Sequence, residues 1–330
     1  MKNNIQKPQD NFQQHSAGRT IADKGSAPDL SVVIAGVKFK NPIIAASGTF
    51  GFGKEYAELF DLSCLGGICT KGLTLEPRPG NSGERLWETP AGLLNSIGLE
   101  NPGIKEFLKN ELPRMRKIKT VIIANLSGST IEEYAEGAAL LNNSDIDMIE
   151  LNISCPNVKA GGIAFGLDPA AACSVTEPVR RACPDKPLIV KLSPNAADIT
   201  AIAKACINSG ADAISLVNTI KAMAIDIKKK KLVFDNISAG LSGPAIKPIA
   251  LRMVWELNTA LAEQTPAIPI IGMGGISNTE DALEFLMAGA KAIQIGSATF
   301  ANPFVMPEII DGIKLYMQKN KLAGIGEITL

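Results

Sequence analysis

The sequence is poor in the groups that many enzymes use as catalytic bases or metal ligands. Its one histidine among 330 residues is His15, which lies in a polar segment near the N-terminus. An imidazole base is therefore not expected, and a catalytic base would have to be a cysteine, a lysine or a carboxylate. The six cysteines include no CxxC pair, and a chain of this size needs no disulfide to fold. We therefore expect reduced thiols, no metal site and a cytoplasmic location.

Net charge and long apolar runs are also lacking. Lys plus Arg and Asp plus Glu number 33 each, so no overall charge favours binding to nucleic acid or to an anionic membrane. The longest apolar runs, such as residues 31–37 and 268–271, fall far short of the ~20 residues that a membrane-spanning helix needs. Residues 1–29 are polar, lack the apolar stretch of a signal peptide, and are interpreted as a flexible N-terminal extension. The sequence thus predicts a soluble protein with neither a membrane nor a nucleic-acid partner.

What the sequence does contain is a regular alternation of short β-rich runs and helical patterns from Asn41 onward. Such alternation is typical of βα units around a parallel sheet. Eight β-rich runs occur, the number in a (β/α)8 barrel: residues 42–47, 67–71, 121–125, 148–153, 188–192, 213–218, 268–273 and 292–296. An open doubly wound sheet would share this pattern. We predict an α/β fold with a single TIM barrel over residues 30–330, and insertions over the C-terminal face of its strands.

Two long segments and two helix starts carry further predictions. Residues 72–119 and 219–267 follow the second and sixth strands, where barrel active sites are built, and are predicted to be loops that cover the site. Within the second, residues 224–227 and 232–234 flank four lysines at 228–231, which predicts a hairpin with a solvated charged tip. Capping boxes are predicted at Thr130 with Glu133 and at Ser277 with Glu280.

Polar or glycine residues close all eight predicted strands. In a barrel these positions meet at one rim and would face a common pocket. Lysines that follow apolar runs would be costly to bury without an anionic partner. The eight residues are Ser47, Lys71, Asn125, Asn152, Lys191, Asn218, Gly274 and Gly296.

Four loops are candidates for binding and chemistry. Gly274-Gly275 and Gly296-Ser297 follow the last two strands, where barrels commonly bind phosphate through backbone N–H groups. Cys155 lies just past the fourth strand and is predicted to be a reactive thiol that acts as an acid or base. The other five cysteines are predicted to be inert core residues. Residues 95–99 suit either a small anion or an ordinary turn.

At these residues the sequence resembles the class 1 dihydroorotate dehydrogenases, which are soluble and use a cysteine base. The resemblance covers residue 30 to about residue 316, with the motifs in the family's order. They are ASGTFG at 46–51, TKG at 70–72, NSIGL at 95–99, NISCPN at 152–157, VNT at 217–219, GMGG at 272–275 and IGS at 295–297.

The resemblance implies an FMN-containing barrel, an oxidoreductase that converts dihydroorotate to orotate in pyrimidine biosynthesis. Cys155 as thiolate would take the proton from C5 while C6 delivers hydride to FMN. Lys191 would stabilise the anionic reduced flavin. The implied FMN contacts are Ser47, Lys71, Gly72, Asn125, Asn152, Lys191, Val217, Gly243, Gly274, Gly275, Gly296 and Ser297. The implied substrate contacts are Lys71, Asn95, Ser96, Ile97, Gly98, Leu99, Asn152, Asn218 and Thr219.

Further motifs resemble the NAD-linked class 1B branch of this family. They are GFGKEY at 51–56, NVKAGG at 157–162 and FG at 165–166. Class 1B implies a partner subunit that carries FAD and an iron-sulfur cluster and passes electrons to NAD, with a homodimer of catalytic subunits inside a heterotetramer. The sequence departs from class 1B in its longer polar extension before Leu30.

Three alternatives stay open. One is a fumarate-dependent class 1A enzyme, and another is an FMN barrel for a different dihydropyrimidine, such as a tRNA dihydrouridine synthase, which zero net charge disfavours. The third is a catalytically silent phosphate-binding barrel.

Overall fold

The computed structural model describes residues 27–153, 165–263 and 266–330. Its centre is a closed barrel of parallel strands in the order β10-β15-β16-β3-β4-β7-β8-β9. These strands are β3 (Ile43–Ala45), β4 (Gly67–Cys69), β7 (Val121–Leu126), β8 (Met148–Asn152), β9 (Leu188–Lys191), β10 (Ala213–Leu216), β15 (Ile270–Met273) and β16 (Ala292–Ile295). All eight fall within or overlap the predicted runs, so the prediction of a TIM barrel is confirmed.

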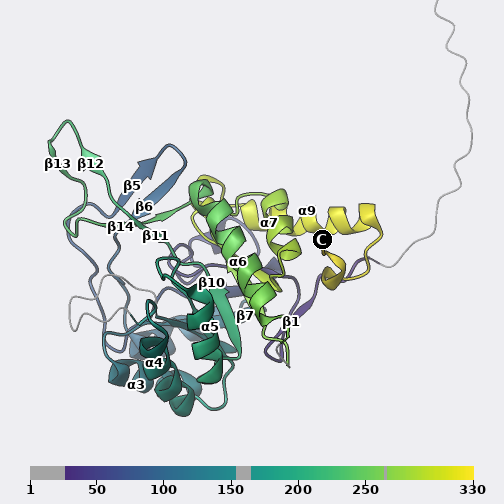
Figure 1. The fold of residues 1–330 in the computed structure, drawn as a ribbon, viewed down its shortest axis with the longest axis horizontal. Helices are drawn as coiled ribbons and strands as arrows, with labels where there is room; N and C mark the ends of the chain where they lie inside the picture. The colour runs from purple at the N-terminus through teal and green to yellow at the C-terminus, as the bar shows by residue number, and fades with distance from the viewer. Residues whose placement is uncertain (1–26, 154–164, 264–265) are drawn as a thin grey trace, which may run out of the picture.

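The barrel strands are buried on both faces, which explains their nearly continuous apolar sequences. Helices surround them and bury their apolar sides against the same core (Figure 1). The helices are α1 (Ile104–Glu106), α2 (Leu112–Met115), α3 (Ile131–Asn142), α4 (Pro169–Ala182), α5 (Ile199–Asn208), α6 (Lys247–Leu261), α7 (Thr279–Met287), α8 (Ala298–Ala301) and α9 (Val305–Asn320). Short helical turns are η1 (Tyr56–Glu58), η2 (Leu62–Cys64), η3 (Phe107–Glu111), η4 (Pro244–Ile246) and η5 (Ile325–Glu327).

The two predicted capping boxes have different outcomes. Thr130 caps α3 as predicted, because its hydroxyl accepts the Glu133 N–H at 3.2 Å, although the Glu133 carboxylate accepts from Ser129 N–H instead of closing the box. The box at Ser277 with Glu280 is wrong by one residue. Asn278 is the cap, and its side-chain oxygen accepts from the N–H of Asp281 at 2.9 Å. Serine and asparagine are both good caps, so their adjacency hides the start of the helix.

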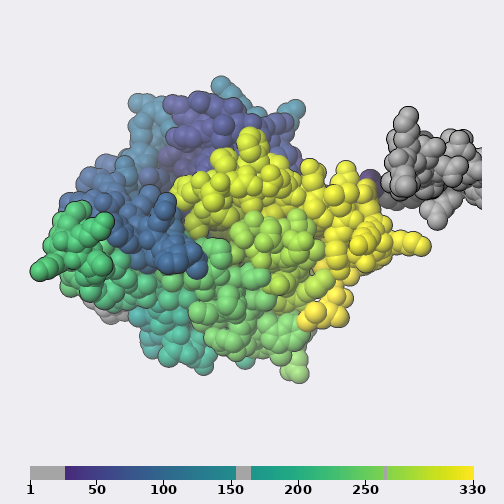
Figure 2. Space-filling model, turned by 90° about the horizontal axis from the view of Figure 1, so that it is seen from above, coloured from purple at the N-terminus to yellow at the C-terminus, as the bar shows by residue number. Residues whose placement is uncertain are grey.

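The two long segments are not plain loops, contrary to the prediction. They supply β5 (Leu86–Thr89), β6 (Gly92–Asn95), β11 (Ile220–Ala222) and β14 (Ala239–Ser242), which form one four-stranded sheet in the order β11-β14-β6-β5. The second segment also contains α6. Residues near 90 and near 235 consequently lie side by side at one end of the molecule (Figure 2). A small apolar cluster under this sheet includes Leu94 and Phe234.

Two hairpins complete the described chain. The predicted one is confirmed as β12 (Ile225–Asp226) paired with β13 (Lys231–Leu232). The other, β1 (Val32–Ile34) with β2 (Val37–Phe39), was not predicted. It buries Phe39, whose ring lies against the backbone of Gly67 at the start of β4. The flexible extension over residues 1–29 stays a prediction, since residues 1–26 lie outside the described residues.

In the described part of the chain, no helix has both the length and the apolar character that crossing a membrane requires.

Candidate active site

The carboxyl ends of the barrel strands surround a cavity of about 630 Å³. The four-stranded sheet also contributes to its wall, through Asn95 of β6 and Ser242 of β14. Every predicted FMN contact lines this cavity, as do all but one of the described predicted substrate contacts: Ser47, Lys71, Gly72, Asn95, Ile97, Gly98, Leu99, Asn125, Asn152, Lys191, Val217, Asn218, Thr219, Gly243, Gly274, Gly275, Gly296 and Ser297. The structure therefore brings together residues that the sequence scatters over 250 positions.

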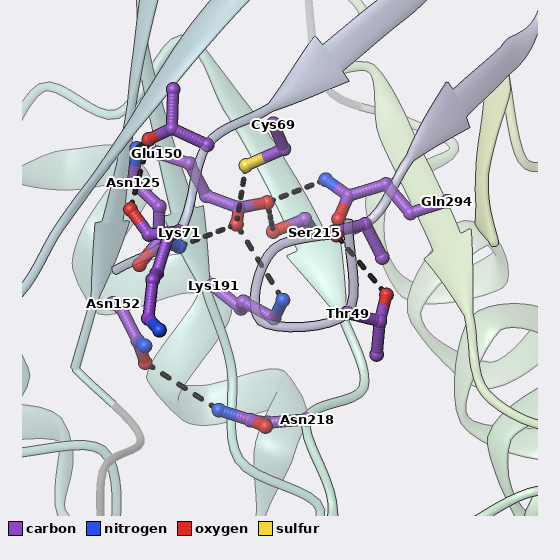
Figure 3. Close-up of polar contacts among 12 residues, drawn as sticks. Thr49, Cys69, Lys71, Asn125, Glu150, Asn152, Lys191, Ser215, Asn218 and Gln294 are labelled. Carbon is purple, nitrogen blue, oxygen red and sulfur yellow. Dashed lines mark hydrogen bonds and ion pairs between the residues drawn. The ribbon is translucent and has the colours of Figure 1, made fainter. Parts of the chain in front are cut away.

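Two predicted residues are exceptions. Ser96 does not line the cavity, and its hydroxyl and carbonyl oxygens accept hydrogen bonds from Asn81 at 3.0 and 3.1 Å. Cys155, the predicted base, lies outside the described residues. The strand that leads to it is described as far as Asn152, whose side chain is at the cavity and accepts from the Asn218 amide at 3.5 Å (Figure 3).

Glycine is required by the backbone where the chain turns after β15. Gly274 and Gly275 have φ angles of +123° and +77°, which L residues with a side chain rarely adopt. A methyl group on Gly275 would come within 2.8 Å of the Gly243 carbonyl oxygen and of the Lys247 backbone nitrogen. The turn thus brings two stretches of backbone, at 243 and 275, close together at the cavity wall.

Lys71 has an acidic partner that could not be identified from the sequence patterns. Its ammonium lies 3.8 Å from the Glu100 carboxylate, which also accepts from the Arg85 guanidinium at 2.8 Å. Both Lys71 and Glu100 line the cavity. A ligand carboxylate that reached Lys71 would therefore compete with Glu100 for the ammonium.

A second missed residue lies beneath the cavity. Glu150, in the middle of β8, is fully buried and is the acceptor for side chains from four other strands (Figure 3). A fifth strand contributes Lys191, whose ammonium is 3.5 Å from the carboxylate. The four donors are Asn125 at 2.7 Å, Cys69 at 3.2 Å, Ser215 at 2.9 Å and Gln294 at 2.6 Å. A single acidic residue inside the apolar run Met148–Asn152 is the signal that could have identified it.

This network fixes the charge of its members. Burial by itself raises the pKa of Glu150, but the Lys191 ammonium and the donors Gln294, Cys69 and Ser215 outweigh it and bring the pKa below its ordinary value. Burial, followed by the neighbouring Glu150 charge, raises the pKa of Cys69 well above its ordinary value. Glu150 is therefore a carboxylate at neutral pH, and Cys69 is a thiol that donates to it, as expected of an unreactive core cysteine.

The carbonyl oxygens of two of these donors lack a partner among the described residues. They are Oδ1 of Asn125 and Oε1 of Gln294, both buried and both on residues that line the cavity. Buried carbonyl oxygens are nearly always hydrogen bonded in folded proteins. Lys191 lines the same cavity. The two carbonyl oxygens and the Lys191 ammonium together suit a planar ligand that carries an N–H donor and acceptor oxygens, as the ring system of FMN does.

An ion pair between the half-buried Lys247 and the buried Asp281 stabilises the loop after β15. The Asp281 carboxylate contacts the Lys247 ammonium at 2.7 Å and accepts from the N–H and hydroxyl of Ser277 at 2.9 and 2.8 Å. Burial raises the pKa of Asp281, but the Lys247 and Ser277 contacts outweigh it, so the pKa lies below the ordinary 3.8. A carboxylate with a lowered pKa stabilises the fold above its ordinary pKa and loses that contribution as the pH falls through the lowered value.

We expect Asp281→Asn to lower the free energy of unfolding by about 1.5–3 kcal/mol at pH 7, the usual effect of losing hydrogen bonds to a charged group. The difference in unfolding free energy between wild type and variant should narrow as the pH falls from 5 to 3, because the carboxyl group of the unfolded chain, with its ordinary pKa of 3.8, is protonated before the folded one. Thermal unfolding of both proteins across this pH range measures the gap. A gap that stays constant over the range would contradict the role assigned to the ionised Asp281.

Comparison with known proteins agrees with this geometry. The sequence model of the family described as dihydroorotate dehydrogenase matches residues 29–317. The chain belongs to the dihydroorotate dehydrogenase family. The predicted family resemblance is thus confirmed.

Similar members of the dihydroorotate dehydrogenase family carry the name dihydroorotate dehydrogenase B (NAD(+)), catalytic subunit. The protein of Petrotoga mobilis is 58% identical over 300 residues, which cover 91% of this chain and 98% of the relative. Those of Geotalea daltonii and Thermoanaerobacter pseudethanolicus are 52% and 53% identical, each over 91% of this chain and 97% of the relative. Because nearly all of each relative is matched, the comparison covers the whole barrel.

Proposed function

We propose that the chain is the catalytic subunit of an NAD-linked dihydroorotate dehydrogenase, which oxidises dihydroorotate to orotate in pyrimidine biosynthesis. The observation that carries this proposal is the cavity itself. It combines the lysines, asparagines and glycine turns of the family's motifs at one end of the barrel, in a chain 58% identical to a relative of that name. The same name favours the NAD-linked branch over the fumarate-dependent class 1A alternative.

FMN is the cofactor of this family, and we propose that the cavity holds it. The unpartnered carbonyl oxygens of Asn125 and Gln294, the Lys191 ammonium, and the turn at Gly274-Gly275 support this fit. When bound, FMN supplies the acceptor for the hydride that leaves C6 of dihydroorotate. The residues that would hold it are Ser47, Lys71, Gly72, Asn125, Asn152, Lys191, Val217, Gly243, Gly274, Gly275, Gly296 and Ser297.

The substrate would lie between Lys71 and the asparagines. The Lys71 ammonium can pair with the dihydroorotate carboxylate, a charge-assisted contact that fixes the ring in place. Asparagine amides suit the imide edge of the ring because each offers both a donor and an acceptor. The proposed contacts are Lys71, Asn95, Ser96, Ile97, Gly98, Leu99, Asn152, Asn218 and Thr219, with Ser96 acting through the loop that it belongs to.

Cys155 would be the general base that removes the proton from C5. Support comes from the sequence, in which Cys155 follows the cavity residue Asn152 by three positions and no histidine is near. Lys191 would place a positive charge at the cofactor and so favour electron transfer to it. In this division the protein orients the substrate with Lys71, takes the proton with Cys155 and stabilises negative charge with Lys191.

The words "catalytic subunit" in the relatives' names support a partner subunit. We propose that this partner carries FAD and an iron-sulfur cluster and passes the electrons to NAD. We further propose a homodimer of this chain within a heterotetramer, and a cytoplasmic location, since the five described cysteines are all free and reduced thiols are typical of the cytoplasm.

The proposed activity is tested by adding dihydroorotate anaerobically to the purified FMN-loaded chain while recording the visible flavin spectrum. We expect the flavin to bleach as it is reduced. When NAD and the partner subunit are added, we expect dihydroorotate to be oxidised over repeated turnovers. The control is the same addition of orotate, which has no hydride to give. A flavin that stays yellow with dihydroorotate would contradict the proposed substrate. A chain that binds no FMN would contradict the proposed cofactor.

A further inference from the structure

The polar side chains beneath the cavity are organised around one carboxylate. Glu150 accepts from Asn125 and Gln294 on opposite sides, and these two residues together with Lys191 form the cavity floor (Figure 3). Every contact in this cluster is buried, since Glu150 is 0% exposed and Lys191 is 5% exposed. A buried carboxylate is costly unless its oxygens accept hydrogen bonds, so the side chains around Glu150 are restricted to orientations that donate to it.

An ionised carboxylate has no proton to donate, so every group that approaches it must be a donor. The amides of Asn125 and Gln294 each have one donor end and one acceptor end. Their NH2 groups must therefore face Glu150, and their carbonyl oxygens must turn away from it. This is the arrangement in the structure, where both oxygens are buried and lack a partner among the described residues.

We propose that Glu150 is a positioning residue that sets the hydrogen-bonding polarity of the cavity floor. It holds the amides of Asn125 and Gln294 so that their carbonyl oxygens are available to a ligand, and it anchors the ammonium of Lys191. The floor then offers acceptors and one positive charge. The ligand class that fits is a planar ring with an N–H donor beside carbonyl oxygens, a description that rests on the proposed function and is met by the pyrimidine ring of FMN.

The test replaces Glu150 by glutamine, which has nearly the same shape but carries an NH2 group of its own. That group needs an acceptor, so at least one of the amides at positions 125 and 294 must turn over and present its NH2 to the ligand. We expect the dissociation constant of FMN from Glu150→Gln to rise at least about tenfold, and the visible band of the remaining bound flavin to shift. Titration of the apoprotein with FMN measures both.

The matched control is Asp147→Asn. Asp147 precedes the same strand, and its carboxylate pairs with Arg116 at 2.8 Å, but it does not line the cavity. We expect FMN affinity and spectrum to be unchanged in this variant. Glu150→Asp keeps the charge, so it should recover part of the affinity that Glu150→Gln loses. An equal rise in the FMN dissociation constant of Asp147→Asn and Glu150→Gln would overturn the proposal.

Gln294→Met is a second variant that tests the proposal if Glu150→Gln does not fold. It removes one acceptor oxygen while leaving Glu150 with its other donors, and we expect weaker FMN binding by about tenfold. Wild-type affinity in Gln294→Met, or wild-type affinity and spectrum in Glu150→Gln, would overturn the positioning role. A wild-type chain that binds no FMN would instead overturn the proposed cofactor, so the two failures are distinguishable.

Discussion

Replacement of Cys155 by serine should leave FMN bound and slow flavin reduction by dihydroorotate by about 10²–10⁴-fold, the usual contribution of a general base. Serine is close to cysteine in size but is a far weaker base, because its hydroxyl ionises only at much higher pH than a thiol. The proton at C5 would then have no adequate acceptor. Anaerobic stopped-flow measurement of flavin bleaching gives the rate directly, separate from the later steps that involve NAD.

The pH dependence sharpens this prediction. The thiolate is the active form of a cysteine base, so the wild-type rate should rise with pH through the pKa of the thiol. Cys155→Ser should lack this rise. Cys173→Ser is the matched control, since Cys173 lies on α4, donates to the Ala205 carbonyl oxygen and does not line the cavity. Unchanged reduction kinetics in Cys155→Ser would remove Cys155 from the mechanism, whatever the control shows.

The barrel could be predicted from the sequence because each of its strands and helices is indicated by a pattern within a short stretch of the chain. Each strand is a short apolar run with a polar or glycine residue within two positions of its end, and a helical pattern follows along the chain. The four-stranded sheet over the cavity could not be predicted in this way. Its strands β6 and β14 pair Asn95 with Gly240, which are 145 positions apart in the chain, and no local pattern specifies such a pairing.

The candidate site shows the same division. Lys71, Lys191 and the asparagines were predicted because they close strands, and in a barrel all strand ends meet at one rim. Glu150 was missed because it lies two residues before the end of its strand, within the barrel. Its importance depends on five side chains from five other strands, and only the folded barrel brings these together.

Replacement of Gly275 should weaken cofactor binding strongly. We expect Gly275→Ala to raise the dissociation constant of FMN about 100-fold, equivalent to about 2.7 kcal/mol. The added methyl group would lie 2.8 Å from the carbonyl oxygen of Gly243, so the two stretches of backbone at the cavity wall must move apart. Overpacking of this kind costs about 1–3 kcal/mol, and the displacement falls on residues that would hold the cofactor.

Gly36→Ala separates this steric effect from backbone strain. Gly36 has a φ of +81°, close to the +77° of Gly275, but a methyl group there would meet no heavy atom within 4 Å. Both variants should lose about 1–2 kcal/mol of stability from the left-handed backbone. Gly275→Ala should lose more than Gly36→Ala because of the overpacking, and only Gly275→Ala should bind FMN more weakly. Thermal unfolding of the apoproteins and titration with FMN measure the two effects independently. If both variants bind FMN equally well, the close approach of residues 243 and 275 does not shape the cofactor site, and the loop after β15 must tolerate displacement.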